Sequence, residues 1–171
     1  MGIDPGSRVV GYGLIELMPE VRGLPAPRYV ECGVIEPKAT KSLGERLLEI
    51  AVSLREVFAE LSPGEVAVES VFVCRSAASA LRLGHARGVV LLCAAEAGTP
   101  LYEYAPMRVK KAVTGSGAAS KEQVQQMVRV LLGLRRAPVA DAADALAVAM
   151  CHAYTVGARL VREGRRPVEE R

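Results

Sequence analysis

The first thirteen residues, M-G-I-D-P-G-S-R-V-V-G-Y-G, constrain the fold more than any other part of this chain. Their pattern predicts a strand, a turn and a returning strand, because Pro5 fixes its own φ and Gly6 tolerates a positive φ. Asp4 falls near the end of the first strand, beside Ile3, which we expect to be buried. A carboxylate on a core strand is costly unless a cation or several hydrogen bonds compensate its charge. We therefore expect Asp4 to have a partner.

Aspartate is rare in this sequence. Of 19 acidic residues only Asp4, Asp141 and Asp144 are aspartates, and all the others are glutamates. A single aspartate is often a helix cap or a turn residue, but that interpretation explains the three together less well. Asp141 and Asp144 are three residues apart in a stretch with a helical pattern, so both should project from one face near the N-terminal end of that helix.

The remaining pattern predicts one α/β domain. Strands are expected at Arg8–Leu17 and Arg28–Ile35, with a Pro- and Gly-rich hairpin loop at Met18–Pro27 between them. Gly11 and Gly13 in the first of these strands predict that another backbone comes close to it. Helices are expected at Ser42–Leu61, Ser76–Gly98, Pro106–Val113, Ser120–Leu132 and Ala140–Tyr154, and short strands at Glu65–Phe72 and Thr99–Tyr104. Ser42 and Ser120 are each followed three residues later by Glu or Gln, which predicts a capping box at the start of both helices. Three hairpin-joined strands followed by strand–helix alternation predict a mixed five-stranded sheet with helices on both faces, an α/β fold of the ribonuclease-H-like kind. We expect one domain over residues 1–155 and a basic tail over 156–171.

Composition excludes several classes of protein. No run of eighteen residues lacks a charge, so no membrane span is expected. The first strand begins at once, which leaves no room for a signal peptide. Four scattered cysteines without a C-x-x-C motif and only two histidines argue against a zinc site, and the cysteines are typical of reduced thiols in a cytoplasmic protein. A net charge of +3 is compatible with an anionic partner.

A fourth acid interrupts another apolar strand. Glu69 lies in E-V-A-V-E-S-V-F, which we expect to neighbour the first strand. If the last helix packs over that edge of the sheet, Asp4, Glu69, Asp141 and Asp144 converge. Such a cluster raises the pKa of its members unless divalent metal neutralises it, and ligands that are all oxygen favour Mg²⁺ or Mn²⁺. Two such ions roughly 4 Å apart would suit phosphodiester hydrolysis, one activating water and the other stabilising the leaving 3′-oxygen.

The segments G-I-D-P-G-S-R-V-x-G-Y-G, A-V-E-S-V-F, S-A-L-R-L-G-H-A-R-G-V, V-K-K…K-E-Q-V-Q-Q-M-V and A-D-A-A-D-A-L-A-V-A together resemble the RuvC-type Holliday-junction resolvases, in order from residue 1 to about 155. The resemblance implies that the four acids bind two Mg²⁺ per subunit, with Mn²⁺ as a possible substitute. It implies a homodimer that nicks two strands of like polarity in a four-way DNA junction, leaving 5′-phosphate and 3′-hydroxyl ends in recombination and repair. Branch-migration proteins of the RuvAB type are the implied partners.

Six residues are predicted to contact DNA: Phe72, Arg75, Arg108, Lys110, Lys111 and Lys121. The resemblance implies that Phe72 stacks at the strand-exchange point and that Lys110 and Lys121 hold the phosphate backbone near the cut. The basic residues from 108 to 121 bracket the loop T-G-S-G-A-A beside the predicted acid cluster, where cations would help a phosphodiester approach. The alternatives are a core role for Phe72, a solvated cap for Arg75 and an ordinary solvated face for the basic run.

The long helix at Ser76–Gly98 is the candidate dimer contact, because Gly84 and Gly88 let another backbone come close. The alternative is that these glycines pack onto the sheet of their own subunit. We expect His85, on the same helix, to be buried or at an interface rather than catalytic. Three other functions compete with junction cleavage: a ribonuclease-H-like nuclease on another nucleic acid, a junction-binding protein that does not cleave, and an actin-like ATPase, for which the chain is too short.

Overall fold

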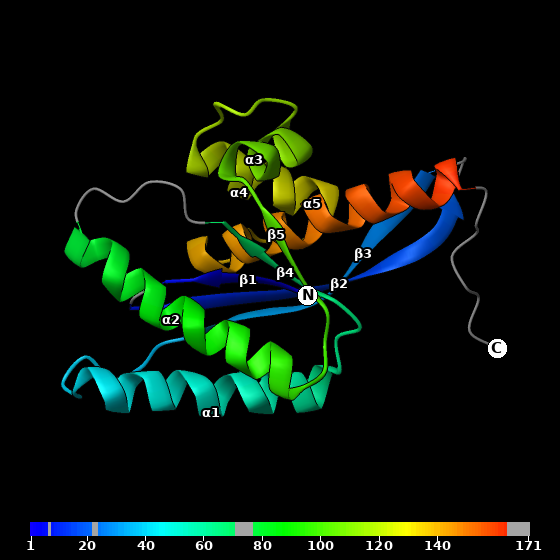
Figure 1. Cartoon of the computed structure of the whole chain (residues 1–171). Helices are drawn as coiled ribbons and strands as arrows, with labels where there is room; N and C mark the ends of the chain where they lie inside the picture. The colour runs from blue at the N-terminus through cyan, green and yellow to red at the C-terminus, as the bar shows by residue number, and fades with distance from the viewer. Residues whose placement is uncertain (7, 22–23, 71–76, 164–171) are drawn as a thin grey trace.

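A computed structural model of the chain describes residues 1–6, 8–21, 24–70 and 77–163 (Figure 1). The strands are β1 (Gly2–Pro5), β2 (Val10–Val21), β3 (Leu24–Ile35), β4 (Val66–Glu69) and β5 (Leu101–Tyr104), and the helices are α1 (Leu43–Leu61), α2 (Ala77–Glu96), α3 (Pro106–Thr114), α4 (Lys121–Leu131) and α5 (Ala140–Arg162). The strand order is β3-β2-β1-β4-β5. β1 pairs with β2, and β2 with β3, in antiparallel fashion, whereas β1–β4 and β4–β5 are parallel. The predicted mixed five-stranded sheet is confirmed.

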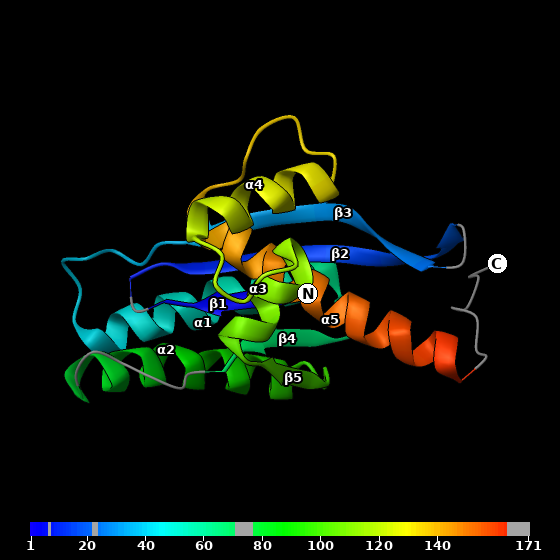
Figure 2. The same cartoon turned by 90° about the horizontal axis from the view of Figure 1, so that it is seen from above.

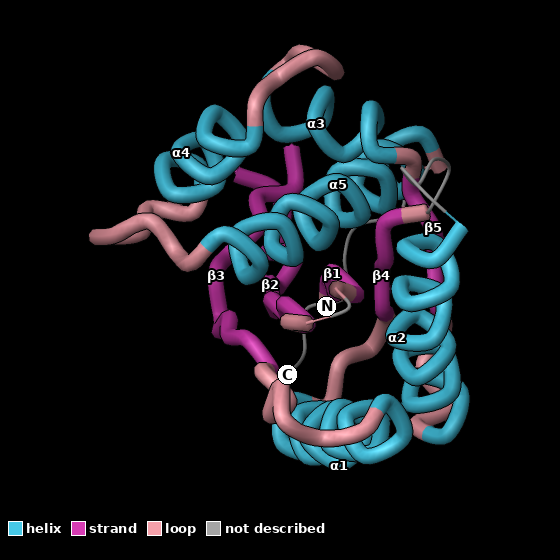
Figure 3. The backbone as a smooth tube through the Cα atoms, turned by 90° about the vertical axis from the view of Figure 1, so that its left-hand side faces the viewer, coloured by secondary structure: helices cyan, strands magenta, loops and turns pink. Residues whose placement is uncertain are grey.

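Helices cover both faces of the sheet, as predicted. Figures 1 and 3 show α1 and α2 on one face and α3, α4 and α5 on the other. Each face has its own apolar core: Ile3, Leu54 and Val90 belong to the first, and Leu146 and Val128 belong to the second. None of the helices in the described ranges is both long and apolar enough to cross a membrane.

The alternation of side chains along β1 and β4 decides where the first two acids point. Ile3 and Val68 are paired across the two strands, are fully buried and belong to the core beneath α1 and α2. One residue further along each strand come Asp4 and Glu69. Because successive side chains of a strand face opposite sides of the sheet, both acids face α5. The sequence pattern therefore places them on one surface without any contribution from a loop.

α5 lies directly on β1 and β2 because those strands carry glycine where it crosses them (Figure 3). A Cβ built on Gly2 would lie 2.0 Å from the carbonyl oxygen of Ala145, and one on Gly11 would lie 2.0 Å from that of Asp141. On the helix side, α5 presents a series of buried alanines to the sheet. The close backbone approach predicted from Gly11 and Gly13 is thus confirmed, and it brings the first turns of α5 down to the end of β1.

Several element ends differ from prediction. The expected loop Met18–Pro27 is wrong, because β2 and β3 continue through most of it as a long hairpin. β3 is an edge strand, and proline is tolerated there. The last helix does not end at Tyr154 but continues to Arg162, through the boundary expected between residues 155 and 156. Figure 2 shows that this end of α5 reaches about as far as the β2–β3 hairpin and passes the ends of β4 and β5. Both predicted capping boxes, at Ser42 and Ser120, are present.

A partly buried chain of polar side chains, which the sequence did not predict, joins the middle of α5 to β5 and to the residue before β4. His152 Nε2 lies 2.7 Å from the carboxylate of Glu65, and its Nδ1 lies 2.8 Å from the hydroxyl of Tyr104. The Tyr102 ring stacks beside the imidazole, with the two ring centroids 4.7 Å apart. Burial lowers the pKa of His152, and Glu65 opposes that shift. These contacts help to fix the distance between α5 and the sheet whose strands carry the acids.

Candidate functional site

Three of the four predicted acids meet in one small cavity. Asp4 reaches it from the end of β1, Glu69 from the end of β4 and Asp144 from the first turns of α5. The cavity has a volume of about 110 Å³. Its complete lining is Asp4, Glu69, Pro106, Val109, Lys110, Lys121, Val124, Asp144 and Ala147. Helices α3 and α4 therefore form the remaining walls, with apolar side chains around a charged centre.

The carboxyl groups perturb one another. The pKa of Asp4 is raised from 3.8 to about 7, first by burial and then by the charges of Asp144 and Glu69. Burial also raises the pKa of Glu69, followed by the charge of Asp144. Acids that repel each other in a partly dehydrated cavity favour protonation or the arrival of a cation. The predicted mutual effect of these acids on their pKa values is present here.

Two lysines supply positive charge at the same place. The ammonium group of Lys121 lies 2.8 Å from a carboxylate oxygen of Asp144. Lys110 lines the cavity and donates to the carbonyl oxygen of Ala119 at 2.7 Å. Both lysines act to lower the pKa of Glu69, against the effect of Asp144. The cavity thus combines three acids with two cations, one of which is already paired.

Asp141 lies close to this cavity but does not line it. Its charge contributes to the raised pKa of Asp4, and its carbonyl oxygen lies over Gly11. Within the part of the chain that the structure describes, no three His, Cys, Asp or Glu side chains are placed as ligands of one metal ion. The donor set nevertheless fits a hard cation, because carboxylate oxygens are the ligands that Mg²⁺ and Mn²⁺ prefer. Lys121 pairs with one of the two Asp144 oxygens, so a cation that binds this oxygen would displace the lysine.

The other predicted DNA contacts lie in different places. Arg108 is exposed on α3, where its guanidinium covers the ring of Tyr104 at 5.1 Å and donates to the hydroxyl of Thr155. Lys111 is exposed on the same helix, and neither residue lines the acid cavity. Phe72 and Arg75 lie outside the described residues.

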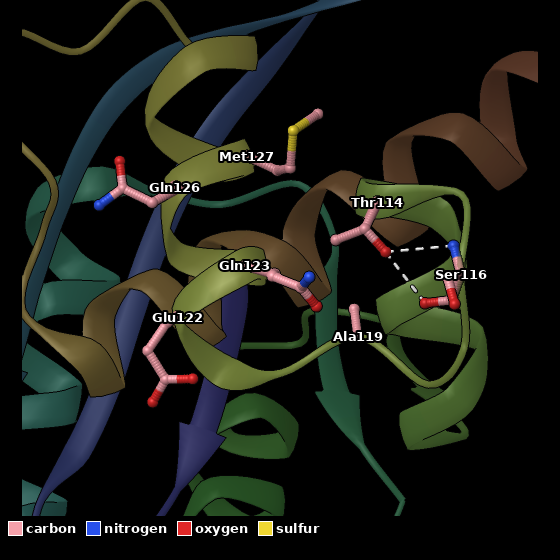
Figure 4. A pocket seen from close by; sticks show the side chains of 7 residues that line it. All are labelled: Thr114, Ser116, Ala119, Glu122, Gln123, Gln126 and Met127. Carbon is pink, nitrogen blue, oxygen red and sulfur yellow. Dashed lines mark hydrogen bonds between the residues drawn. The ribbon is translucent and has the colours of Figure 1, made fainter.

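A larger hollow of about 480 Å³ lies nearby, between the C-terminal end of α3, the following loop and α4. Figure 4 shows the side chains that line it: Thr114, Ser116, Ala119, Glu122, Gln123, Gln126 and Met127. Thr114 and Ser116 bond to each other there, and the amide of Gln123 is used by the Ser120 capping box. This hollow contains none of the four acids, so the smaller cavity is the candidate for chemistry.

One residue near the acids was missed by sequence reasoning. Arg87 on α2 donates to the backbone carbonyl of Glu69 at 2.9 Å. The two residues are 18 positions apart and belong to different elements. The predicted proximity of strand and helix could have suggested such a contact, but nothing in the spacing identifies which arginine makes it.

Comparison with known proteins agrees with this geometry. The model of the family described as "RuvC: Crossover junction endodeoxyribonuclease RuvC" matches residues 1–152. Proteins named crossover junction endodeoxyribonuclease RuvC from Halorhodospira halophila and Chromohalobacter salexigens are 52% and 49% identical over 154 residues, which is 90% of this chain and 89% and 80% of theirs. The structure of Thermus thermophilus RuvC in complex with Holliday junction substrate superposes with a TM-score of 0.82 at 38% identity, covering 96% of this chain and 95% of that one.

Proposed function

The chain belongs to the RuvC family of crossover junction endodeoxyribonucleases. We propose that it resolves four-way DNA junctions by symmetric nicking. Its fold is the ribonuclease-H-like fold of that family. The observation that carries the proposal is the convergence of Asp4, Glu69 and Asp144 on one cavity beside two lysines. Asp141 joins them as the fourth acid. The products are a 5′-phosphate and a 3′-hydroxyl on two strands of like polarity.

The four acids would hold two Mg²⁺ per subunit, with Mn²⁺ as a substitute. When bound, such ions activate the attacking water and stabilise the leaving 3′-oxygen. The chain's own contribution is to hold the acids on a rigid sheet and one helix, so that their oxygens are in place before the substrate arrives. Lys110 and Lys121 border the cavity and would bind the phosphates on either side of the scissile bond. Lys121 would then give up its ion pair with Asp144 and pair with a DNA phosphate.

The remaining basic residues and Phe72 complete the proposed DNA surface. Arg108 and Lys111 are exposed on α3, on the rim rather than inside the cavity, so we assign them to more distant phosphates. Arg75 and Phe72 keep their predicted roles at the junction, the aromatic ring by stacking on a base. Branch-migration proteins of the RuvAB type remain the proposed partners. Cys32, Cys93 and Cys151 are free thiols, which supports action in the reducing cytoplasm.

A substrate panel tests the proposed activity. Labelled four-way junction, linear duplex and RNA–DNA hybrid are incubated with the protein, once with Mg²⁺ and once with EDTA. We expect paired nicks in the junction only, and none in EDTA. Cleavage of the hybrid instead would favour a ribonuclease-H-like enzyme with another substrate, and tight junction binding without any nick would favour a binding protein.

The homodimer has a candidate surface on the outer face of α2. Leu81 and Leu92 are 63% and 51% exposed, and Gly84 and Gly88 lie between them with open space in front. The alternative that these glycines pack within their own subunit is therefore wrong. Positions 81, 84, 88 and 92 fall on one side of a helix, so two copies of α2 could approach closely along this stripe.

Leu92→Glu tests the dimer. Placing a charge at the C-terminal end of the stripe should turn a dimer into a species with the mass of one chain, measured by light scattering after size-exclusion chromatography. Junctions should then receive single, uncoordinated nicks. Leu48→Glu is the matched control, because Leu48 is similarly exposed, at 60%, but lies on α1. Dissociation by Leu48→Glu and not by Leu92→Glu would place the interface on α1.

A further inference from the structure

Arg87 joins three elements at the end of the sheet where the acids lie. Its Nη1 donates to the carbonyl oxygen of Glu69 on β4 at 2.9 Å, and its Nη2 lies 2.7 Å from the carboxylate of Glu103 on β5. The Arg87 side chain is only 15% exposed, whereas that of Glu103 is 50% exposed. A buried guanidinium with two fixed acceptors holds a defined geometry, because its donors lie in one plane.

The bond to Glu69 falls at the point where β4 loses its neighbour on one side. The parallel register of β1 and β4 pairs Ile3 with Val68, the residue before Glu69. On the other side, β5 still holds the chain, since the amide of Ser70 donates to the carbonyl oxygen of Tyr104 at 2.8 Å. Arg87 therefore adds an anchor to the Glu69 peptide from the α2 side of the sheet. Fixing that peptide fixes the direction of the Glu69 side chain.

Arg87 acts on Glu69 through the backbone rather than through charge. The charges that affect the Glu69 carboxyl are those of Asp144, Lys121 and Lys110. The guanidinium is itself paired with Glu103, on the opposite side of the peptide from the acid cavity's lysines. The effect of Arg87 on Glu69 should therefore depend on the hydrogen-bond geometry of the guanidinium, and a lysine at this position should replace it only in part.

We propose that Arg87 is a positioning residue, which holds the end of β4 so that the Glu69 carboxylate keeps its position relative to the carboxylates of Asp4 and Asp144. This inference rests on the proposed function, in which Glu69 is a metal ligand. Groups that orient ligands typically change metal affinity or activity by about 10- to 100-fold when removed. A merely structural arginine would instead change stability and leave these quantities as they are.

The chain offers a matched control for the structural explanation. Arg55 on α1 forms a bidentate pair with Glu96 on α2, at 2.7 and 3.1 Å, and touches neither β4 nor the acids. Arg55→Met and Arg87→Met each remove one arginine–glutamate pair that involves α2. Glu103→Gln is a second control, because it removes the ion pair of Arg87 and retains the bond to Glu69.

Three measurements are made on each full-length variant: Mn²⁺ binding without DNA, by the loss of the free-ion electron paramagnetic resonance signal; junction affinity; and single-turnover cleavage. For Arg87→Met we expect Mn²⁺ binding about tenfold weaker and cleavage about 10- to 100-fold slower, with junction affinity unchanged. Arg87→Lys should recover part of both losses. Arg55→Met and Glu103→Gln should match the unmodified chain.

Two results would overturn the proposal. The first is Mn²⁺ binding and cleavage by Arg87→Met equal to those of Arg55→Met. The second is a loss in Glu103→Gln as large as that in Arg87→Met, which would assign the effect to the ion pair. If Arg87→Met does not fold, Arg87→Lys against Glu103→Gln makes the same comparison. Failure of the proposed function has a different signature, because the unmodified chain would then not nick the junction, while the Mn²⁺ titration would still separate Arg87→Met from Arg55→Met.

Discussion

Asp4→Asn should abolish Mg²⁺-dependent nicking of a four-way junction while leaving junction binding largely in place. Burial and then the neighbouring acids raise the pKa of Asp4 to about 7, and an amide in its place keeps the shape but removes the charge of a proposed metal ligand. Loss of several kcal/mol of transition-state stabilisation corresponds to a rate lower by about 10³-fold or more. Cleavage and binding are measured on the same labelled junction, with Glu56→Gln on the far face of the sheet as the control.

The same substitution should stabilise the metal-free protein. The folded-state pKa of Asp4, about 7, lies above its ordinary value of 3.8, so ionised Asp4 disfavours the fold. The penalty is absent below about pH 4, grows as the pH rises through the interval between the two values and is complete above about pH 7. There it amounts to at most about 4 kcal/mol. Asp4→Asn removes it, so its melting temperature in EDTA should exceed that of the unmodified chain at pH 8 but not at pH 4.

Added Mg²⁺ should reverse this order, because an ion that binds only the folded state stabilises it by mass action, and the variant lacks a ligand. Nicking by Asp4→Asn at the unmodified rate would reject the metal site. A melting temperature of Asp4→Asn below that of the unmodified chain, in EDTA at pH 8, would show that ionised Asp4 does not destabilise the fold.

Gly11→Ala should cost both stability and activity. The new Cβ would lie 2.0 Å from the carbonyl oxygen of Asp141 and 2.5 Å from its carbonyl carbon. These are backbone atoms, so relief requires β2 and α5 to separate. Overpacking of this kind costs about 1–3 kcal/mol, and often more where backbone must move. Since Gly11 is paired with Asp4 across the hairpin, the separation also draws Asp141 and Asp144 away from Asp4, and a displacement of about 1 Å can cost about 10²-fold in rate.

The matched control is Gly44→Ala, since nothing lies within 4 Å of a Cβ on Gly44 and the residue is helical. There the change should be neutral or stabilising, because alanine favours the helix. Urea denaturation gives the free energy of unfolding, and cleavage is measured on the folded protein. Equal behaviour of the two variants would mean that α5 does not rest on the glycines of the sheet.

The sequence predicted what depends on local pattern and missed what depends on contact. The strands, the two capping boxes and the close approach at Gly11 each leave a signature of a few residues. The end of α5 does not: the pattern predicted an end at Tyr154, but the helix continues past Gly157, which is buried within it and where packing outweighs the low helix propensity of glycine. The two strands of the hairpin were predicted too short for a similar reason. Pro27 is typical of loops, but it is tolerated on an edge strand such as β3.

At the candidate site the same division holds. The convergence of Asp4, Glu69 and Asp144 could be predicted because carboxylates on apolar strands are conspicuous and the helical spacing places Asp144 near the start of α5. Arg87 and His152 were not found, since each acts on an element far away in the sequence. Their roles depend on which turn of a helix meets which strand, and the periodicity of the chain does not determine that.

The pair formed by Lys121 and Asp144 has a consequence for how the protein exists between substrates. The ammonium group of Lys121 lies among three carboxylates and acts as their counter-ion, so its charge offsets part of their mutual repulsion. The exposed lysine can leave without disturbing the fold, because its helix is anchored by other residues such as Val124 and Val128. Binding of the proposed divalent metal would therefore exchange one cation for another, rather than bring charge to a site that has none.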